Sequence, residues 1–348
     1  MIQTIRSAWK VQELRNKLLF TIFALLIFRI GSAIPVPFID TESLKTYMAS
    51  QSSSIFGLLN VMSGDAFAQA TVFALSIQPY INSSIIVQLL TIAIPALEKM
   101  ARDEGEEGKK KIAAITRYAT VAIALLQAFG YYKLISYYEL VADGLWPAFV
   151  IIFAFTAGSA FLMWLGEQIT EFGIGNGISV LLFAGIVSRF PHMLRDMISG
   201  IQAYLNPRTE EQLAAMTEVE RAAYENSILA PWMIAVIVVG MLALVVLIVF
   251  ISNSERRLPV QYAKRVVGRK MYGGQSTHIP IKVNMGGVMP IIFAQSIAMI
   301  PATIGAFAGW TTESGGFGGT LMMLFDTANP FYSVLYFLLI VGFSYFYA

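Results

Sequence analysis

The chain of 348 residues contains no cysteine and only two histidines, His192 and His278. Disulfides, thiolate metal sites and cysteine nucleophiles are therefore excluded, and a histidine-rich metal site is not expected because the two residues lie far apart in the sequence. Charge is also scarce: 13% of the residues are charged and 56% are apolar. This charged fraction is about half of what is usual in a soluble domain. The composition favours a membrane protein.

Long apolar runs dominate the sequence. A helix needs about 20 apolar residues to cross the hydrocarbon core of a bilayer. We predict eight spans: 18–37, 71–97, 112–132, 147–166, 176–190, 231–251, 284–306 and 331–348. The fifth is short, and the eighth runs to the last residue without a polar exit, as expected of a truncated chain. The predicted fold class is an all-α polytopic membrane protein.

Lysine and arginine gather in alternate loops. The basic segments are the N-terminus before residue 18, the loop after the second run and the loop after the sixth. The intervening loops hold few such residues, among them Lys45 and Lys133. Cytoplasmic loops are enriched in Lys and Arg, and the N-terminus lacks the pattern of a cleavable signal peptide. We therefore expect a cytoplasmic N-terminus that leads directly into the first span.

The second run is unusually polar for a membrane span. Its uncharged polar side chains are Gln78, Asn82, Ser83, Ser84 and Gln88. At 100° per residue, several of them share a helix face with the two isoleucines at 81 and 85. Polar groups in a span are tolerated where they face protein or water. Two interpretations follow: amides that bond neighbouring helices in a packed bundle, or a wet wall that is pinched by the isoleucines.

Two short motifs need separate interpretations. The stretch IFGLLNVMS at 55–63 is too short to span, so it is either an interfacial or re-entrant helix or a mobile element packed inside the protein. GIGNG at 173–177 looks like a dinucleotide-binding loop but joins two spans rather than a strand and a helix. It predicts a tight hairpin in which Asn176 and Gly177 begin a helix.

Few chemical groups suit a transporter or an enzyme. Transporters and proton pumps usually bury ionisable residues in the middle of their spans, and Arg29 is the one charge near the middle of a predicted span. A secondary transporter would also need a midplane site with broken helices. Ser276 and His278 have no acid partner nearby in the sequence that would support a nucleophile. A path without charged ligands suits a substrate that is long, variable and not specifically bound.

Four blocks carry a resemblance to a known family. They are FRIGSAIPVPFID (28–40), ALSIQPYINSSIIVQLL (74–90), GEQITEFGIGNGISVLLFAGI (166–186) and QYAKRVVGRKMYGGQSTHIPIKVNMGGVMPIIFAQSI (261–297). In this order they resemble SecY proteins, the central subunits of the bacterial protein-conducting channel. The resemblance covers the entire chain.

The resemblance implies ten spans in two pseudo-symmetric halves of five, which clamp an hourglass pore, with a lateral gate between the second and seventh spans. The implied pore ring is Ile81, Ile85, Leu182 and Ile292. The implied lateral-gate residues are Gln88, Gln127 and Ser296. The implied plug, which seals the ring from outside, is Ile55, Phe56, Gly57, Leu58, Leu59, Asn60, Val61, Met62, Ser63 and Gly64. No cofactor is implied.

The basic loop 252–283 is the implied docking surface. The residues expected to carry it are Arg256, Arg257, Lys264, Arg265, Arg269 and Lys270. The resemblance favours the ribosome or the motor ATPase SecA as the partner, while anchoring to anionic lipid is the alternative. Small SecE-like and SecG-like membrane subunits are further expected partners, and signal peptides and nascent chains are the expected substrates. The expected location is the bacterial cytoplasmic membrane.

The implied domain organisation has three parts. Residues 1–190 form the N-terminal half with spans one to five and the plug, residues 191–230 form an extracytoplasmic loop, and residues 231–348 form an incomplete C-terminal half. The family's ninth and tenth spans have no counterpart in this sequence. The chain is expected to be a channel subunit and not an enzyme.

Overall fold

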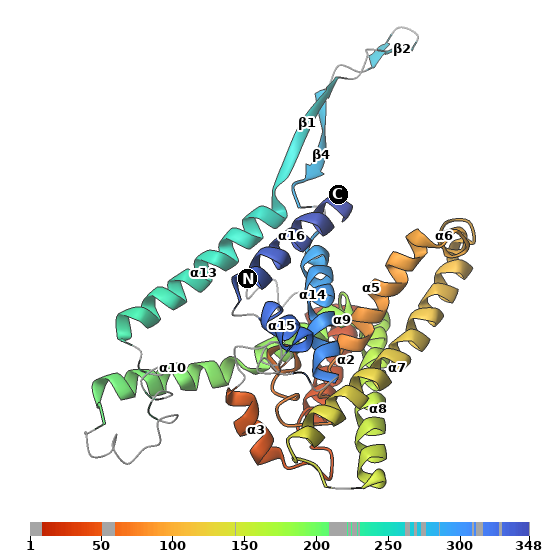
Figure 1. The fold of residues 1–348 in the computed structure, drawn as a ribbon. Coiled ribbons are helices and arrows are strands. Elements are labelled where there is room, and N and C mark those ends of the chain that lie inside the picture. Colours follow the sequence, from red (N-terminus) through yellow and green to blue (C-terminus); the bar gives the residue numbers. More distant parts are fainter. Residues whose placement is uncertain are drawn as a thin grey trace. The chain divides into compact units, whose positions relative to one another are not determined.

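The structure is a computed structural model that describes residues 9–50, 60–142, 144–208, 221, 224, 228, 230–261, 265–267, 270–272, 276–284, 286–307, 310, 316–326 and 329–347. The described part is mainly helical, as the composition predicts (Figure 1). By Cα proximity the chain divides into two compact units. Unit 1 contains Met1–Phe190 and Gln295–Phe337, and unit 2 contains Pro191–Ala294 and Leu338–Ala348.

The helices agree with a multi-pass membrane protein. Those long and apolar enough to span a membrane, among the described residues, are α7 (Gly105–Tyr137), α8 (Leu145–Phe172), the Gly177–Leu205 segment and α13 (Pro231–Asn253). The Gly177–Leu205 segment consists of α9 (Gly177–Ser188) and α10 (Phe190–Leu205) and is longer than the predicted fifth span. The remaining helices are α2 (Gln12–Gly31), α3 (Thr41–Ser50), α5 (Gln78–Ala93), α6 (Pro95–Arg102), α14 (Met289–Phe307), α15 (Phe317–Leu324) and α16 (Pro330–Tyr347).

The second predicted span is not one straight helix over 71–97. Helix α5 begins only at Gln78, with Pro79 in its first turn, and the residues before it form turns in which Ser76 has a φ of 53°. Proline fits the first turn because it has no N–H to offer. The chain then bends by 101° between α5 and α6, where Pro95 follows the extended Ile94. The span is therefore a short helix of 16 residues between two breaks.

Unit 1 is a bundle in which α5, α7 and α8 lie side by side, with α2 and α9 against α8 (Figure 1). The GIGNG hairpin joins α8 to α9, as predicted. Asn176 caps α9 because its side chain accepts a hydrogen bond from the Ser179 backbone N–H at 3.2 Å. Gly177 lies against the Gly166 carbonyl so closely that a Cβ at Gly177 would overlap it. The lack of a side chain at Gly177 therefore allows α9 to approach α8 closely.

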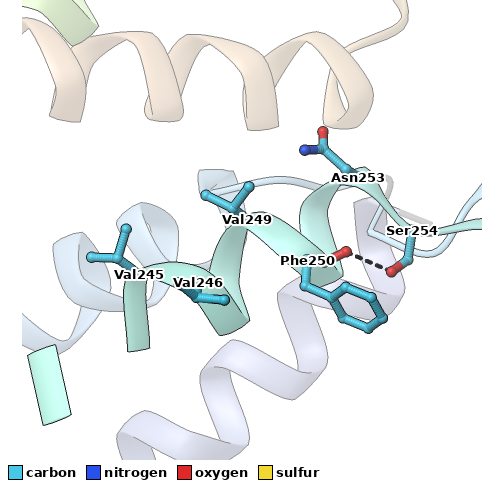
Figure 2. A pocket seen from close by; sticks show the side chains of 6 residues that line it. All are labelled: Val245, Val246, Val249, Phe250, Asn253 and Ser254. Carbon is cyan, nitrogen blue, oxygen red and sulfur yellow. Dashed lines mark hydrogen bonds between the residues drawn. The ribbon is translucent and has the colours of Figure 1, made fainter. Parts of the chain in front are cut away.

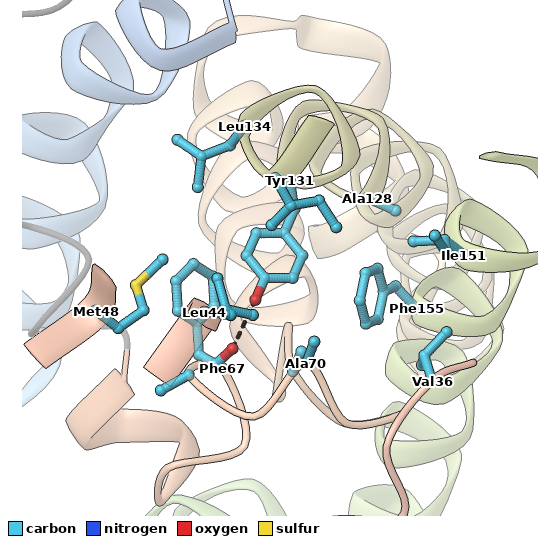
Figure 3. Packing of buried hydrophobic residues seen from close by; sticks show 13 residues of the cluster. Val36, Leu44, Met48, Phe67, Ala70, Ala128, Tyr131, Leu134, Ile151 and Phe155 are labelled. Atoms are coloured by element: carbon cyan, nitrogen blue, oxygen red, sulfur yellow. Dashed lines mark hydrogen bonds between the residues drawn. The ribbon is translucent and has the colours of Figure 1, made fainter. Parts of the chain in front are cut away.

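A buried apolar cluster fixes the chain just before α5 (Figure 3). Its members come from α3, α7, α8 and the loops at 36 and 67–74: Val36, Leu44, Met48, Phe67, Ala68, Ala70, Ala74, Ala128, Tyr131, Leu134, Ile135, Ile151 and Phe155. The fully buried Tyr131 hydroxyl donates a hydrogen bond of 2.6 Å to the Phe67 carbonyl. Burial of the ring and this bond together attach residues 66–74 firmly to α7.

Unit 2 contains a long antiparallel ribbon that sequence analysis did not predict. Strand β1 (Glu255–Gln261) pairs with β4 (Ser276–Lys282), in a register that places Glu255 opposite Lys282 and Gln261 opposite Ser276. The shorter strands β2 (Arg265–Val267) and β3 (Lys270–Tyr272) pair farther along the same hairpin. Figure 1 shows that β1 follows directly on α13. The described parts of the basic loop thus form an antiparallel β-ribbon.

Helix α13 buries none of its side chains. An open apolar groove runs along its C-terminal half, lined by Val245, Val246, Val249, Phe250, Asn253 and Ser254 (Figure 2). The Ser254 hydroxyl donates to the Phe250 carbonyl of α13 at 2.6 Å, so it already has a partner within that helix. An all-round apolar, exposed helix of 23 residues is suited to hydrocarbon surroundings. The groove offers no convergent polar groups for a small ligand.

Candidate pore and plug site

The candidate plug is described from residue 60 onward, while Ile55, Phe56, Gly57, Leu58 and Leu59 lie outside the described residues. The chain is helical over 60–63 and then leaves the helix at two residues with left-handed backbone. These are Gly64, with a φ of 66°, and Asp65, with a φ of 70°. Gly adopts this conformation freely, whereas Asp needs local hydrogen bonds to hold it. The sharp turn separates the plug segment from the anchored residues 66–74.

Asn60 and Asp65 close this turn through side-chain hydrogen bonds. The Asn60 amide nitrogen donates to Asp65 Oδ1 at 2.9 Å, and the Asp65 backbone N–H donates to the Asn60 carbonyl at 3.0 Å. Asn60 Oδ1 in turn accepts from the Ala68 backbone N–H at 2.9 Å. Ser63 adds a further link, because its hydroxyl accepts from the Phe67 N–H at 3.0 Å. Almost every polar group of the turn therefore has a partner inside the turn.

The same turn contacts the C-terminal end of α9. Arg189 Nε lies 3.3 Å from Asp65 Oδ1, the oxygen that also accepts from Asn60. Two glycines allow the backbones to approach: a Cβ at Gly64 would lie 2.7 Å from the Gly185 carbonyl oxygen. A Cβ at Gly185 would lie 2.6 Å from the Met62 carbonyl oxygen. Neither position has room for a side chain without a shift of the plug end or of α9.

Helix α14 contacts the plug end through Gln295. Its amide nitrogen donates to Met62 Sδ at 3.2 Å. Residues 60–64 thus touch both α9 and α14, the helices that carry the predicted ring residues Leu182 and Ile292. Sequence analysis missed Gln295, although it directly precedes the predicted gate residue Ser296 and is one of few amides in that apolar run.

The predicted ring residues differ in burial. Ile81 and Ile85 on α5 are buried, at 6% and 5% exposure. On α9, Leu181 is buried and lies close to Gly166 of α8. Leu182, the next residue along α9, is half-buried. Ile292 on α14 is half-buried and belongs to unit 2. Convergence of the four side chains on one axis stays a prediction.

The polar side chains of α5 serve more than one purpose. The Ser83 hydroxyl is buried and donates to the Thr116 carbonyl of α7 at 2.8 Å, which is the helix-joining role that sequence analysis considered. Gln88 is exposed. Among the described side chains, the buried polar atoms without a hydrogen-bond partner are Asn82 Oδ1 on α5 and Ser296 Oγ on α14. Buried polar atoms usually have a partner, so these two are exceptions among the described side chains.

The other predicted gate residue, Gln127, is half-buried on α7. Sequence analysis missed an ion pair on the same helix, in which Arg117 Nε lies 2.8 Å from Glu167 Oε1 of α8. Arg117 lies in the first third of the predicted span 112–132, and Glu167 directly follows the predicted span 147–166. The pair links α7 to α8, and neither residue belongs to the predicted ring or gate.

The predicted docking residues lie on the ribbon of unit 2. Arg256 and Arg257 are exposed on β1. Arg265 lies on β2 and Lys270 on β3, while Lys264 and Arg269 fall outside the described residues. In an antiparallel ribbon adjacent residues point to opposite faces, so Arg256 and Arg257 present charge on both faces. Within the described chain no group of three or more His, Asp or Glu residues is arranged to hold a metal ion.

Comparison with curated proteins gives long matches. The SecY translocase subunit of Streptomyces scabiei is 39% identical over 361 residues, which cover 100% of this chain and 76% of the relative. The SecY subunit of Bacillus subtilis is 37% identical over 353 residues, with the same coverage. The SecY subunit of Buchnera aphidicola subsp. Acyrthosiphon kondoi is 40% identical, with 96% of this chain and 88% of the relative covered.

Comparison with solved structures shows the same fold at low identity. A structure described as that of a protein conducting channel matches with a TM-score of 0.59 and 17% identity, over 95% of this chain and 70% of that chain. Sec61 in the canine ribosome-channel complex from the endoplasmic reticulum matches with a TM-score of 0.52 and 18% identity, over 86% of this chain and 62% of that chain. The SecY family model matches residues 71–348, and together with the curated relatives this shows that the chain belongs to the SecY family.

Proposed function

We propose that this SecY family member is a protein-conducting channel that passes unfolded secretory polypeptides across the membrane and releases apolar segments sideways into the bilayer. The observation that carries the proposal is the position of the plug end. Residues 60–64 lie against α9, through Gly64 and Gly185, and against α14, through Met62 and Gln295. An element that lies between two helices is suited to close a path between them.

The proposed pore ring is Ile81, Ile85, Leu182 and Ile292. Branched aliphatic side chains offer no hydrogen-bonding group to a passing peptide, so they fit loosely around any extended chain and bind none. When the pore is empty, an apolar constriction excludes water and thereby limits ion leak. The absence of charged ligands in this ring matches a substrate of variable sequence.

The proposed gate lies between α5 and α14, and Gln88, Gln127 and Ser296 are its proposed polar lining. A segment that meets both water and lipid there is sorted by its own composition. Leu, Ile, Phe and Val each gain about 0.3–0.6 kcal/mol at the centre of an inserted helix, whereas Asp, Lys and Arg each lose about 2.5–3.5 kcal/mol. A signal peptide or membrane anchor therefore leaves sideways, and a polar segment passes through.

The same proposal covers the organisation of the chain in the membrane. Residues 1–190 form the N-terminal half, residues 191–230 an extracytoplasmic loop and residues 231–348 the part of the C-terminal half present here. The N-terminus lies on the cytoplasmic side of the bacterial cytoplasmic membrane. The channel itself is not an enzyme, and the motor that drives transport is a separate partner.

The exposed ribbon is the proposed docking surface for the ribosome or SecA, and SecE-like and SecG-like subunits are proposed to complete the channel. Arg256 and Arg257 are exposed on an ordered strand that follows directly on a membrane helix. Exposed arginines on a strand are suited to contact a polyanion such as ribosomal RNA, and such binding falls steeply with salt.

Substitution in the ring tests the proposal. Ile81→Asn and Ile292→Asn hydrate the constriction, so we expect ion leak to rise and export of a preprotein with a defective signal peptide to improve by several-fold. The matched control is Ile86→Asn, because Ile86 lies on the same helix as Ile81 but is exposed at 42%. If both ring variants match the control in leak and in export, the ring assignment is wrong.

A further inference from the structure

We propose that Asp65 and Arg189 form an electrostatic latch that holds the plug in its seat, and that this pair sets how strong a signal peptide must be to open the channel. The inference rests on the proposed function, because it assigns a regulatory role to the plug of that channel. Both residues lie in unit 1. The latch is defined as Asp65 together with its two side-chain partners, Asn60 and Arg189.

The geometry places one carboxylate oxygen between two elements. Asp65 Oδ1 accepts from the Asn60 amide at 2.9 Å and lies 3.3 Å from Arg189 Nε. Asn60 belongs to the last turn of the plug helix, and Arg189 directly follows α9. A single atom of Asp65 therefore ties the plug to the helix that carries the ring residue Leu182.

Asp65 lies at the turn between the plug end and the anchored residues 66–74, where a hinge is expected. Its φ of 70° is unusual for a residue with a side chain. Directly after it, residues 66–74 are fixed by the apolar cluster and by the Tyr131 hydrogen bond to Phe67. Motion of the plug must therefore take place on the N-terminal side of this anchor, at the turn formed by Gly64 and Asp65.

The strength of the latch suits a switch. The side chains of Asp65 and Arg189 are 22% and 34% exposed, so water screens the pair in part. Partly exposed ion pairs of this kind change an equilibrium by up to about fivefold. A contact of this size biases the plug toward its seat without preventing its displacement by a signal peptide. The position of Arg189 after the last turn of α9 adds a favourable interaction with the helix dipole.

Substitutions that remove the charge of Asp65 or Arg189 without a large change in side-chain size test the electrostatic contribution by itself. Asp65→Asn keeps the size of the side chain, and asparagine is well tolerated at positive φ. Arg189→Gln removes the partner charge. We expect each variant to raise ion leak through the empty channel, and to raise export of a preprotein with a weakened signal peptide, by about twofold to fivefold. The double variant should match the single variants rather than multiply their effects, because both remove the same interaction.

The matched control is Arg195→Gln, which removes one positive charge from α10. Arg195 lies six residues beyond Arg189 and forms no ion pair within the described residues. A second measurement, thiol crosslinking, reports whether the plug end lies against α14. The chain has no cysteine, so Met62→Cys with Gln295→Cys provides the sole thiols for a short thiol crosslinker. The native side chains meet at 3.2 Å. Crosslinking should fall when Asp65→Asn is added and should be unchanged when Arg195→Gln is added.

The experiments use the channel purified from its own membrane with its associated subunits, and transport of a preprotein with an intact signal peptide is measured first. If the wild type transports nothing, the proposed function itself fails. If the wild type transports normally but Asp65→Asn leaves leak, weak-signal export and crosslinking at wild-type values, the latch is wrong and the channel assignment stands. Multiplicative effects in the double variant also overturn the latch, because the two residues then act separately.

Discussion

The turn at the end of the plug and the basic ribbon use polar residues in opposite ways. At residues 60–68, nearly every polar side chain is satisfied within the turn or by Arg189. On the ribbon, Arg256 and Arg257 are exposed and form no ion pair with any described residue. Polar groups that are satisfied internally fix a conformation, whereas charges left without a partner remain available to another molecule. The first region is suited to regulate and the second to dock.

The largest expected effect concerns docking by the ribbon. Arg256→Glu combined with Arg257→Glu changes the charge by two units at each exposed site. At about 1 kcal/mol for each unit of charge near an anionic surface, the four units amount to about 4 kcal/mol, so we expect binding to the ribosome or to SecA to weaken by about a thousandfold. Binding is measured by cosedimentation at several salt concentrations.

The control for this double reversal is Lys45→Glu with Lys133→Glu, two exposed lysines outside the ribbon. The thermal unfolding transition of each purified variant is compared with that of the wild type to check that the variant is folded. Unchanged ribosome and SecA binding, together with loss of binding to vesicles of anionic lipid, would show that the ribbon is a lipid anchor instead.

The next largest effect concerns the close approach of α9 to the plug end. Gly185→Val places a side chain where the Met62 carbonyl oxygen lies within 2.6 Å of the new Cβ. Overpacking of this kind costs about 1–3 kcal/mol. We expect the plug to be displaced and ion leak to rise by about tenfold, measured as conductance of the reconstituted channel.

Gly240→Val is the matched control, since a Cβ at Gly240 meets no atom within 4 Å. The control should leave conductance unchanged. Equal conductance of the two variants contradicts the view that the plug end is held against α9.

The smallest expected effect concerns the anchor behind the plug. Tyr131→Phe removes the hydroxyl that donates to the buried Phe67 carbonyl at 2.6 Å, while that carbonyl keeps its second donor, the Ala70 backbone N–H at 3.1 Å. We expect a loss of about 0.5–1.5 kcal/mol in the free energy of unfolding, measured by thermal denaturation in detergent. Tyr118→Phe on the same helix, at 79% exposure, should cost almost nothing, and an equal loss in both variants contradicts the anchor.

Local signals predicted much of the fold. The apolar runs indicated the membrane helices, and Asn176 followed by Gly177 predicted the start of α9, because an N-cap depends on residues within one turn. The second span was predicted too long, since apolarity continues across Pro79 and Pro95 although the helix does not. The ribbon was missed because its strands alternate polar and apolar residues only weakly.

The contacts of the candidate site were harder to predict. Asp65 and Arg189 are separated by more than a hundred residues, and so are Met62 and Gln295. A hydropathy pattern states which face of a helix is apolar but not which helix it meets. The ring residues were assigned through resemblance to a family, and that resemblance contains no information on Asp65, whose role depends on the turn geometry of this chain.

The central claim is that a polypeptide passes through the proposed ring of Ile81, Ile85, Leu182 and Ile292. The most direct measurement places a photoreactive amino acid at Ile81 in one variant and at Val239 in another, with a translocating preprotein stalled halfway. Val239 is 65% exposed on the apolar helix α13. The account predicts strong crosslinks from position 81 to the middle of the stalled chain and none from position 239. Crosslinks from position 239 in the absence of crosslinks from position 81 would contradict it.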